Sequence, residues 1–362
     1  MKRLLLFVIL LSFVSCIRPS EERAERDLDI GKASAGGVSF EVAGGLAAVR
    51  SAKAGEIVLW NSAPALRLVA TVKTGGSWVL RVQNALPDLE LSATANGAAL
   101  DATVLDSPLV TRKAWRIELP ASSTVIIDLA PPDAKDLSPW RFAVMSDVQE
   151  AIDRVGDIYA KVNEQKDVRY LVGAGDLTQQ GGDDELERFQ NELRALRVPY
   201  YTTLGNHELG HSPTPYQDWF GRASFSYVYR GVRFSMIDSA SATIDPMVYD
   251  WLDGWLAAAK GGVHVVAMHV PPVDPIGVRN GSFASRNEAA KLLTRLAEGK
   301  VDLTLYGHIH SYYDFDNAGI PAYISGGGGA IPERFDKIGR HFLVVDVDPE
   351  QGIQDVSVVR VD

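Results

Sequence analysis

Five short polar motifs constrain the fold of this chain more than any other feature, because each directly follows an apolar, strand-like run. Strands that alternate with helices bring several strand ends to one edge of a sheet, where ligand sites of α/β proteins usually lie. We therefore expect the five motifs to meet at one place. They are Asp147-Val148-Gln149, Gly175-Asp176, Gly205-Asn206-His207-Glu208, Met268-His269 and Gly307-His308-Ile309-His310.

The region around these motifs has the pattern of alternating strands and helices. Apolar runs predict strands at 141–145, 170–174, 198–204, 232–237 and 263–268. Apolar stripes and cap signals predict helices at 151–163, at 183–196 with Asp183 as N-cap, at 247–259, and from a capping box at Ser285 to about residue 298. The remaining strands are expected at 302–306, 322–325, 342–347 and 356–361. Because the chain ends in strands only, the sheets should be mixed rather than purely parallel.

Residues 38–130 have a different character. Seven short β-rich runs are separated by Gly, Asn, Pro and Asp at roughly ten-residue spacing, which is typical of an all-β sandwich domain. The segment holds no histidine, so we do not expect the chemistry there. Residues 131–136 look like a boundary, and we expect the catalytic domain to cover residues 139–362.

The N-terminus has the pattern of a targeting segment. Lys2 and Arg3 precede an apolar run that is too short to span a bilayer, and the run ends in Phe13-Val14-Ser15-Cys16, with the only cysteine of the chain. This resembles the lipobox of bacterial lipoproteins, which implies that residues 1–16 form a signal peptide, that Cys16 is lipidated, and that Ile17 favours the outer membrane. A plain secretory signal is the alternative. Residues 17–37 are polar and then rich in Gly, Ala and Ser, which predicts a flexible tether.

The residue types at the strand ends indicate a metal site. Together they would supply two aspartates, two side-chain amides and four histidines, a set that suits a pair of divalent ions better than a single ion. The formal net charge of −10 argues against nucleic acid as the main partner.

The five motifs, in this order, resemble the calcineurin-like metallophosphoesterase superfamily over about residues 140–330. Its pattern is Asp-x-His, Gly-Asp, Gly-Asn-His-Asp/Glu, a lone His and Gly-His-x-His. The resemblance implies two mixed β-sheets packed face to face with helices outside. It also implies two metal sites that share Asp176, together with a bridging water or hydroxide. Metal 1 would be held by Asp147, Gln149, Asp176 and His310, and metal 2 by Asp176, Asn206, His269 and His308.

The resemblance further implies the reaction. Two divalent ions (Mn, Fe or Zn) would hydrolyse a small phosphorylated substrate, either a phosphomonoester or a phosphodiester. His207 would stabilise an equatorial oxygen or protonate the leaving group, and Glu208 would orient the His207 imidazole. Gln149 stands where most members have His. Gln179 stands where purple acid phosphatases have a tyrosine ligand, so we expect no coloured iron–tyrosinate centre.

A second interpretation is a non-catalytic binding protein that uses the same cleft with a poorly occupied metal 1. The intact His207 and the complete Gly-His-x-His motif favour the enzyme. With the lipobox, this predicts a phosphoesterase of the bacterial cell envelope, anchored in a membrane on its periplasmic side or at the surface.

Overall fold

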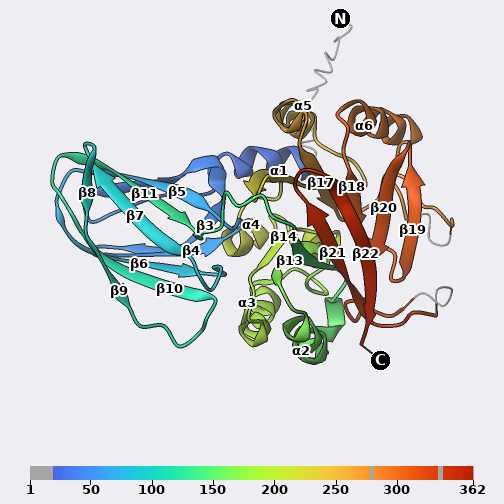
Figure 1. The fold of residues 1–362 in the computed structure, drawn as a ribbon, viewed down its shortest axis with the longest axis horizontal. Helices are drawn as coiled ribbons and strands as arrows, with labels where there is room; N and C mark the ends of the chain where they lie inside the picture. The colour runs from blue at the N-terminus through green and yellow to red at the C-terminus, as the bar shows by residue number, and fades with distance from the viewer. Residues whose placement is uncertain (1–18, 278–280, 333–336, 362) are drawn as a thin grey trace, which may run out of the picture.

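The computed structural model describes residues 19–277, 281–332 and 337–361 of the chain (Figure 1). The expected signal peptide and Cys16 lie outside the described residues. The strands form four sheets, two in the N-terminal part and two in the C-terminal part. No helix within the described ranges is long and apolar enough to cross a membrane.

The N-terminal part consists of two sheets with the strand orders β1-β2-β5-β11-β7-β8 and β3-β4-β6-β10-β9. Apolar side chains of both sheets share one core, in which Phe40 and Leu68 meet Leu59 and Leu80, so the sheets form a sandwich. The predicted β-sandwich is confirmed. Its strands are β1 (Lys32–Ala35), β2 (Val38–Val42), β3 (Ala47–Lys53), β4 (Glu56–Asn61), β5 (Leu66–Val72), β6 (Gly76–Gln83), β7 (Glu90–Ala95), β8 (Ala98–Leu100), β9 (Ala102–Leu105), β10 (Arg112–Leu119) and β11 (Ser123–Ala130).

The C-terminal part also contains two sheets, and both are mixed. The first has the order β14-β13-β12-β21-β22 and the second β15-β16-β17-β18-β20-β19. Strands β12, β13 and β14 are parallel to one another, as are β16, β17, β18 and β20, while β15, β19, β21 and β22 are antiparallel to their neighbours. The bounds are β12 (Trp140–Met145), β13 (Val168–Ala174), β14 (Tyr200–Thr203), β15 (Phe225–Tyr229), β16 (Val232–Ile237), β17 (Val263–Met268), β18 (Leu303–Tyr306), β19 (Tyr312–Asn317), β20 (Ile320–Ser325), β21 (His341–Asp348) and β22 (Gly352–Arg360).

Helices cover the outer faces of these two sheets (Figure 1). An aromatic-rich core with Phe142, Tyr170 and Phe234 lies between the sheets. Separate cores lie under α2 and α3 on one side and under α5 and α6 on the other, so the fold class predicted from the sequence is confirmed. The α-helices are α1 (Pro19–Asp27), α2 (Gly156–Glu164), α3 (Asp183–Glu192), α4 (Tyr216–Phe220), α5 (Pro246–Ala259) and α6 (Arg286–Glu298). Short 3-10 turns are η1 (Ala43–Gly45), η2 (Gln149–Arg154), η3 (Leu193–Ala195) and η4 (His207–Gly210).

Two helix predictions need correction. The helix expected at 151–163 is split into η2 and α2, and α2 begins at Gly156, a poor helix former. Asp183 is not an N-cap, because Gly182 precedes the helix and the Asp183 carboxylate accepts a hydrogen bond from Trp219 Nε1 at 2.6 Å. The cap predicted at Ser285 is present, since its hydroxyl accepts from the amide of Glu288.

The flexible tether predicted for residues 17–37 is wrong for residues 19–35. Residues 19–27 form α1, and residues 32–35 form β1 at the edge of a sandwich sheet. The buried positions of α1 are 20, 23, 24 and 27, which follow helical spacing. Three of them are polar or charged (Ser20, Arg23 and Asp27), so the helix lacks the apolar stripe by which helices are recognised in a sequence.

Candidate metal centre

All five polar motifs meet at the carboxyl ends of parallel strands. Asp147, Asp176 and Asn206 follow β12, β13 and β14 of one sheet, and His269 and His308 follow β17 and β18 of the other. Because the two sheets pack face to face, the two sets of strand ends adjoin. This is the edge at which the alternating pattern of the sequence predicted a site.

Acidic and imidazole ligand atoms gather there in two groups. One group contains Asp176, His269 and His308, and the other contains Asp147, Asp176 and His310, with the ligand atoms of each group within 4.8 Å of one another. Asp176 belongs to both groups, so its carboxylate lies between them. Asp147, Asp176 and His269 are almost fully buried, which favours the binding of a cation over solvation of the carboxylates.

The two side-chain amides lie against these groups. Asn206 Oδ1 lies 2.9 Å from His269 Nε2 and 2.8 Å from His308 Nδ1. Gln149 Nε2 donates to Asp176 Oδ2 at 2.8 Å and lies 3.1 Å from His310 Nε2. The structure thus brings together all seven residues that the sequence suggested as ligands, four in each group with Asp176 in common.

Several of these residues have a left-handed backbone. The φ angles are 62° at Asp147, 49° at Gln149, 52° at Asp176 and 70° at His308. Non-glycine residues rarely adopt this conformation, and where it persists it marks positions whose geometry the surroundings enforce, often at functional sites. The backbone therefore supports a site built for a specific arrangement of side chains.

Two motif glycines permit close approach of the strand ends. A Cβ atom at Gly205 would lie 2.1 Å from Asp176 Oδ1, and one at Gly307 would lie 2.7 Å from Asp147 Oδ2. Any larger residue at either position would displace an aspartate. This lack of room explains why a glycine directly precedes both Asn206 and His308.

Two of the three candidate ligand histidines are oriented by backbone carbonyls. His269 donates from Nδ1 to the carbonyl of Ala174 at 2.8 Å, and His310 donates from Nδ1 to that of Ile331 at 2.8 Å. In each ring this leaves Nε2 as the nitrogen that faces the carboxylates, 3.2 Å from Asp176 Oδ2 for His269 and 3.5 Å from Asp147 Oδ1 for His310. Hydrogen bonds of this kind fix the tautomer of metal-binding histidines.

His207 lies beside the groups without belonging to either. Its Nδ1 donates to the carbonyl of Gln179 at 2.8 Å, and its Nε2 lies 3.9 Å from Asp176 Oδ2. The side chain is 24% exposed, in contrast to the buried His269. Nε2 is therefore directed towards the site and within reach of solvent.

The role suggested for Glu208 is wrong, because its carboxylate does not orient the His207 ring. One oxygen accepts from the amides of Asp176 and Gly205 at 3.0 and 2.7 Å, and the other accepts from the amide and hydroxyl of Thr178 at 3.0 and 2.9 Å. Glu208 is fully buried. It joins the loops after β13 and β14, while the carbonyl of Gln179 orients His207.

The electrostatics of the site favour positive charge. Burial raises the pKa of Asp147, although His269 and His310 oppose the rise. Burial would also raise the pKa of Asp176, but His269 and His207 hold it below its ordinary value. Burial alone would lower the pKa of His269, yet the nearby Asp176 and Asp147 raise it to about 9.

Some supporting residues were missed in the sequence. The Ser146 hydroxyl donates to Asp147 Oδ2, Thr178 binds Glu208, and the carbonyls of Ala174, Gln179 and Ile331 orient histidines. Ser146 and Thr178 flank the Asp147 and Asp176 motifs, which is the one signal that could have identified them. The backbone carbonyls could not be identified from the sequence, because every residue has one.

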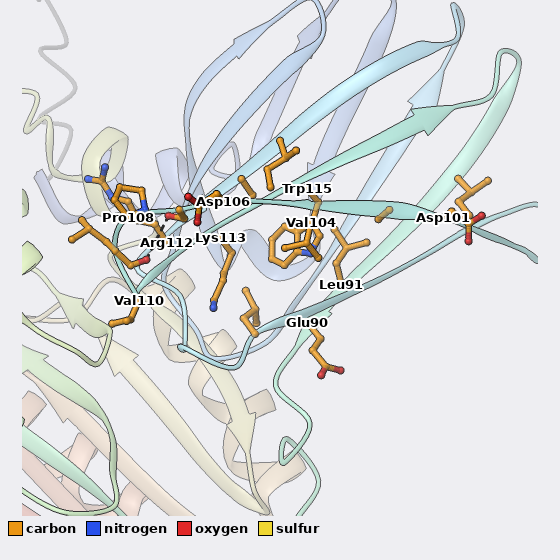
Figure 2. A pocket seen from close by; sticks show the side chains of 17 residues that line it. Glu90, Leu91, Asp101, Val104, Asp106, Pro108, Val110, Arg112, Lys113 and Trp115 are labelled. Carbon is orange, nitrogen blue, oxygen red and sulfur yellow. Dashed lines mark hydrogen bonds between the residues drawn. The ribbon is translucent and has the colours of Figure 1, made fainter.

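A cavity of about 680 Å³ lies elsewhere, in the N-terminal sandwich beside β7, β8, β9 and β10 (Figure 2). Its lining includes Leu91, Val104, Lys113 and Trp115, which Figure 2 labels. None of the candidate ligands contributes to this lining. The convergence of ligand atoms, and not the size of this cavity, identifies the candidate site.

Comparison with known proteins agrees with this location. Residues 141–312 match the model of the family described as calcineurin-like phosphoesterase. A 3′,5′-cyclic-nucleotide phosphodiesterase of Nostoc sp. is 24% identical over 153 residues, which cover 40% of this chain and 56% of the relative. The chain thus spans little more than half the length of this curated relative.

Solved structures are also similar to this chain, at low sequence identity. Purple acid phosphatase PPD1 from seeds of yellow lupin (Lupinus luteus) has a TM-score of 0.54 and 14% identity, with 82% of this chain and 70% of the lupin chain covered. The structure of PhoD has a TM-score of 0.49 and 12% identity, with 83% and 88% covered. The match to the family model thus covers residues 141–312, and the lupin enzyme shares the fold of this chain.

Proposed function

We propose that this protein hydrolyses phosphate esters with two divalent cations held at the candidate site. The observation that carries the proposal is the pair of ligand groups that share Asp176. A carboxylate common to two groups of nitrogen and oxygen donors is the arrangement that a two-metal site requires. The match to the phosphoesterase family model over residues 141–312 supports the same chemistry.

The residues fit two cations. Metal 1 would be held by Asp147, Gln149, Asp176 and His310, and metal 2 by Asp176, Asn206, His269 and His308. Bound cations neutralise the oxygens of a phosphate ester and lower the pKa of a bound water. The buried carboxylates of Asp147 and Asp176 support a demand for positive charge at this place.

His207 is suited to act on the leaving group. The Gln179 carbonyl accepts a hydrogen bond from Nδ1, so Nε2 is the nitrogen that faces the site. When this imidazole is protonated it can stabilise a phosphate oxygen or donate its proton to the departing alkoxide. Glu208 contributes indirectly, since it fixes the amide of Asp176.

The proposed substrate is a small phosphorylated compound, either a monoester or a diester. The proposal is tested with p-nitrophenyl phosphate and bis(p-nitrophenyl) phosphate in the presence of added Mn²⁺. We expect hydrolysis of at least one of them, and loss of that activity in Asp147→Ala. Binding of Mn²⁺ without hydrolysis of either ester, or of any member of a wider panel of phosphate esters, would favour the non-catalytic alternative.

We also propose that the enzyme is anchored in the cell envelope through Cys16. The support is the lipobox-like sequence Phe13-Val14-Ser15-Cys16 after a basic and apolar segment. Cys16→Ser should abolish lipid labelling and release the protein from the membrane fraction. Unchanged labelling and fractionation would refute the anchor.

A further inference from the structure

Helix α1 carries a buried arginine, Arg23, whose guanidinium binds a loop beside the candidate metal centre. The Arg23 guanidinium donates to Asp238 at 2.6 and 3.2 Å and to the Ser241 hydroxyl at 3.0 Å. Arg23 and Asp238 are each 5% exposed. Asp238 and Ser241 belong to the loop that follows β16, which is the neighbour of β17 in its sheet. The first helix of the chain is therefore joined to the edge of the sheet at which the site lies.

The same loop holds the residue that follows a candidate ligand. The Ser239 hydroxyl, directly after Asp238, accepts a hydrogen bond from the amide of Val270 at 2.8 Å. Val270 directly follows His269, and both Ser239 and Val270 are buried. The Arg23 guanidinium is thus connected to the backbone next to His269 through Asp238, Ser239 and Val270.

A second route leads from α1 to the same loop. The Asp27 carboxylate accepts from the amides of Ala223 and Ser224 at 2.8 and 2.9 Å. The Ser224 hydroxyl in turn accepts from the amide of Asp238 at 3.0 Å. Asp238 is consequently fixed at both ends, with its side chain bound by Arg23 and its amide bound through Ser224.

We propose that Arg23 is a positioning residue for metal 2, acting through Asp238 and Ser239 on His269. The inference rests on the proposed function, because it assigns α1 to the framework of the same metal site. Removal of the guanidinium leaves the Asp238 carboxylate buried without its cation, a costly state that the loop relieves by moving towards water. Movement of Ser239 frees the amide of Val270, so the backbone next to His269 is held less firmly, although the Ala174 carbonyl still binds Nδ1 of the ring.

The test compares three substitutions in the full-length protein. Arg23→Ala removes the ion pair, and Arg23→Lys keeps the charge but loses the two-pronged geometry of the guanidinium. Arg26→Ala is the matched control, because Arg26 lies on the same helix but binds Asp218 and the carbonyl of Thr214 instead of the loop after β16. Each protein is titrated calorimetrically with MnCl₂, and its thermal midpoint is measured with a chelator present.

Arg23→Ala should weaken one of the two Mn²⁺ binding steps by about tenfold, the low end for groups that orient metal ligands. Arg23→Lys should fall between this variant and the wild type, and Arg26→Ala should match the wild type. The His310→Ala variant lacks a ligand of metal 1 only. When Arg23→Ala is added to this variant, the binding of metal 2 should again be weakened by about tenfold.

Two results would overturn the positioning role. The first is a lower thermal midpoint in Arg23→Ala with both Mn²⁺ affinities unchanged, since Arg23 would then stabilise the fold alone. The second is equal weakening by Arg23→Ala and Arg26→Ala. Absence of Mn²⁺ binding by the wild type would refute the proposed function along with this inference, so failures at the two levels are distinguishable.

Discussion

His207 and Glu208 are adjacent in the chain but serve different parts of the site. The ring of His207 points towards Asp176, while the carboxylate of Glu208 is buried among the amides of the loops after β13 and β14. A carboxylate that accepts four hydrogen bonds from two loops acts as a structural link between them. At the scale of single residues, the Gly-Asn-His-Glu motif thus supplies one candidate ligand, one candidate proton donor and one link.

The first prediction separates metal binding from proton transfer. Asp176→Asn should weaken both Mn²⁺ binding steps, because this carboxylate is common to both ligand groups. His207→Ala should retain both metals and lose roughly 10²–10⁴-fold in turnover, the range for a positioned acid–base group. Calorimetry and steady-state kinetics check the two outcomes. If both variants lose metal to the same degree, His207 is itself a ligand.

The second prediction concerns Gln149, which lies between Asp176 and His310. A side-chain amide is a weaker donor to Zn²⁺ or Fe than an imidazole is, so metal 1 as proposed is rich in oxygen and suits Mn²⁺. Gln149→His should tighten metal 1 and reduce the dependence of activity on added Mn²⁺. Titration of both proteins with Mn²⁺ and Zn²⁺ measures this, and equal affinities would show that Gln149 does not face the metal.

At the scale of elements, α1 is held by charge where most helices are held by apolar surface. Arg23 and Asp27 lie one turn apart on its buried face, and each binds loops of the C-terminal part. Three donors, the side-chain amide of Gln217 and the backbone amides of Ala223 and Ser224, meet the Asp27 carboxylate. Such an element depends on pH in a way that an apolar helix does not.

The third prediction is a pH dependence of stability that originates from Asp27. Burial raises its pKa from 3.8 to about 7, although its three hydrogen bonds oppose the rise. At low pH the carboxyl is protonated in both the folded and the unfolded chain, so its ionisation does not affect the free energy of unfolding. As the pH rises, the unfolded chain releases the proton first, so the folded state loses stability, by about 3 kcal/mol between about pH 5 and about pH 8.

Asp27→Asn cannot titrate, so its free energy of unfolding relative to the wild type should rise by that amount over the same interval. Urea denaturation of both proteins at several pH values measures the difference, in which the other titrating groups cancel. A difference that stays constant with pH would show that the pKa of Asp27 is not raised in the folded protein.

At the scale of the whole molecule, the Asn84 side chain connects the N-terminal sandwich to the edge of a sheet in the C-terminal part. Asn84 follows β6, and its amide nitrogen donates to the carbonyls of Asn61 and Tyr200 at 2.8 Å each. Its Oδ1 accepts from the amide of Tyr200 at 2.7 Å. Tyr200 begins β14, the edge strand of its sheet, so Asn84 binds that edge much as a further strand would.

The fourth prediction is that Asn84→Ala destabilises the protein by roughly 3 kcal/mol, because buried backbone groups of Asn61 and Tyr200 lose their partner. Asn96→Ala is the matched control, since Asn96 is exposed and has a φ of 50°, close to the 56° of Asn84. Both variants place alanine in a left-handed conformation, so that cost cancels between them. Chemical denaturation should separate the two variants, and equal losses of stability would mean that Asn84 does not join the two parts.

The sequence by itself determined the alternation of strands and helices around the five motifs and the place of the candidate ligands at strand ends. Strand ends are encoded locally, by an apolar run followed by Gly and a polar residue, and parallel strands bring such ends to one edge. For that reason Asp147, Asp176, Asn206, His269 and His310 could be named before the fold was known. Only the tertiary structure decided which atoms face one another, such as Glu208 with the amide of Asp176 and His207 with the carbonyl of Gln179. Helix α1 was missed because its buried stripe is polar, and a polar stripe is stable only when a distant partner such as Asp238 neutralises it.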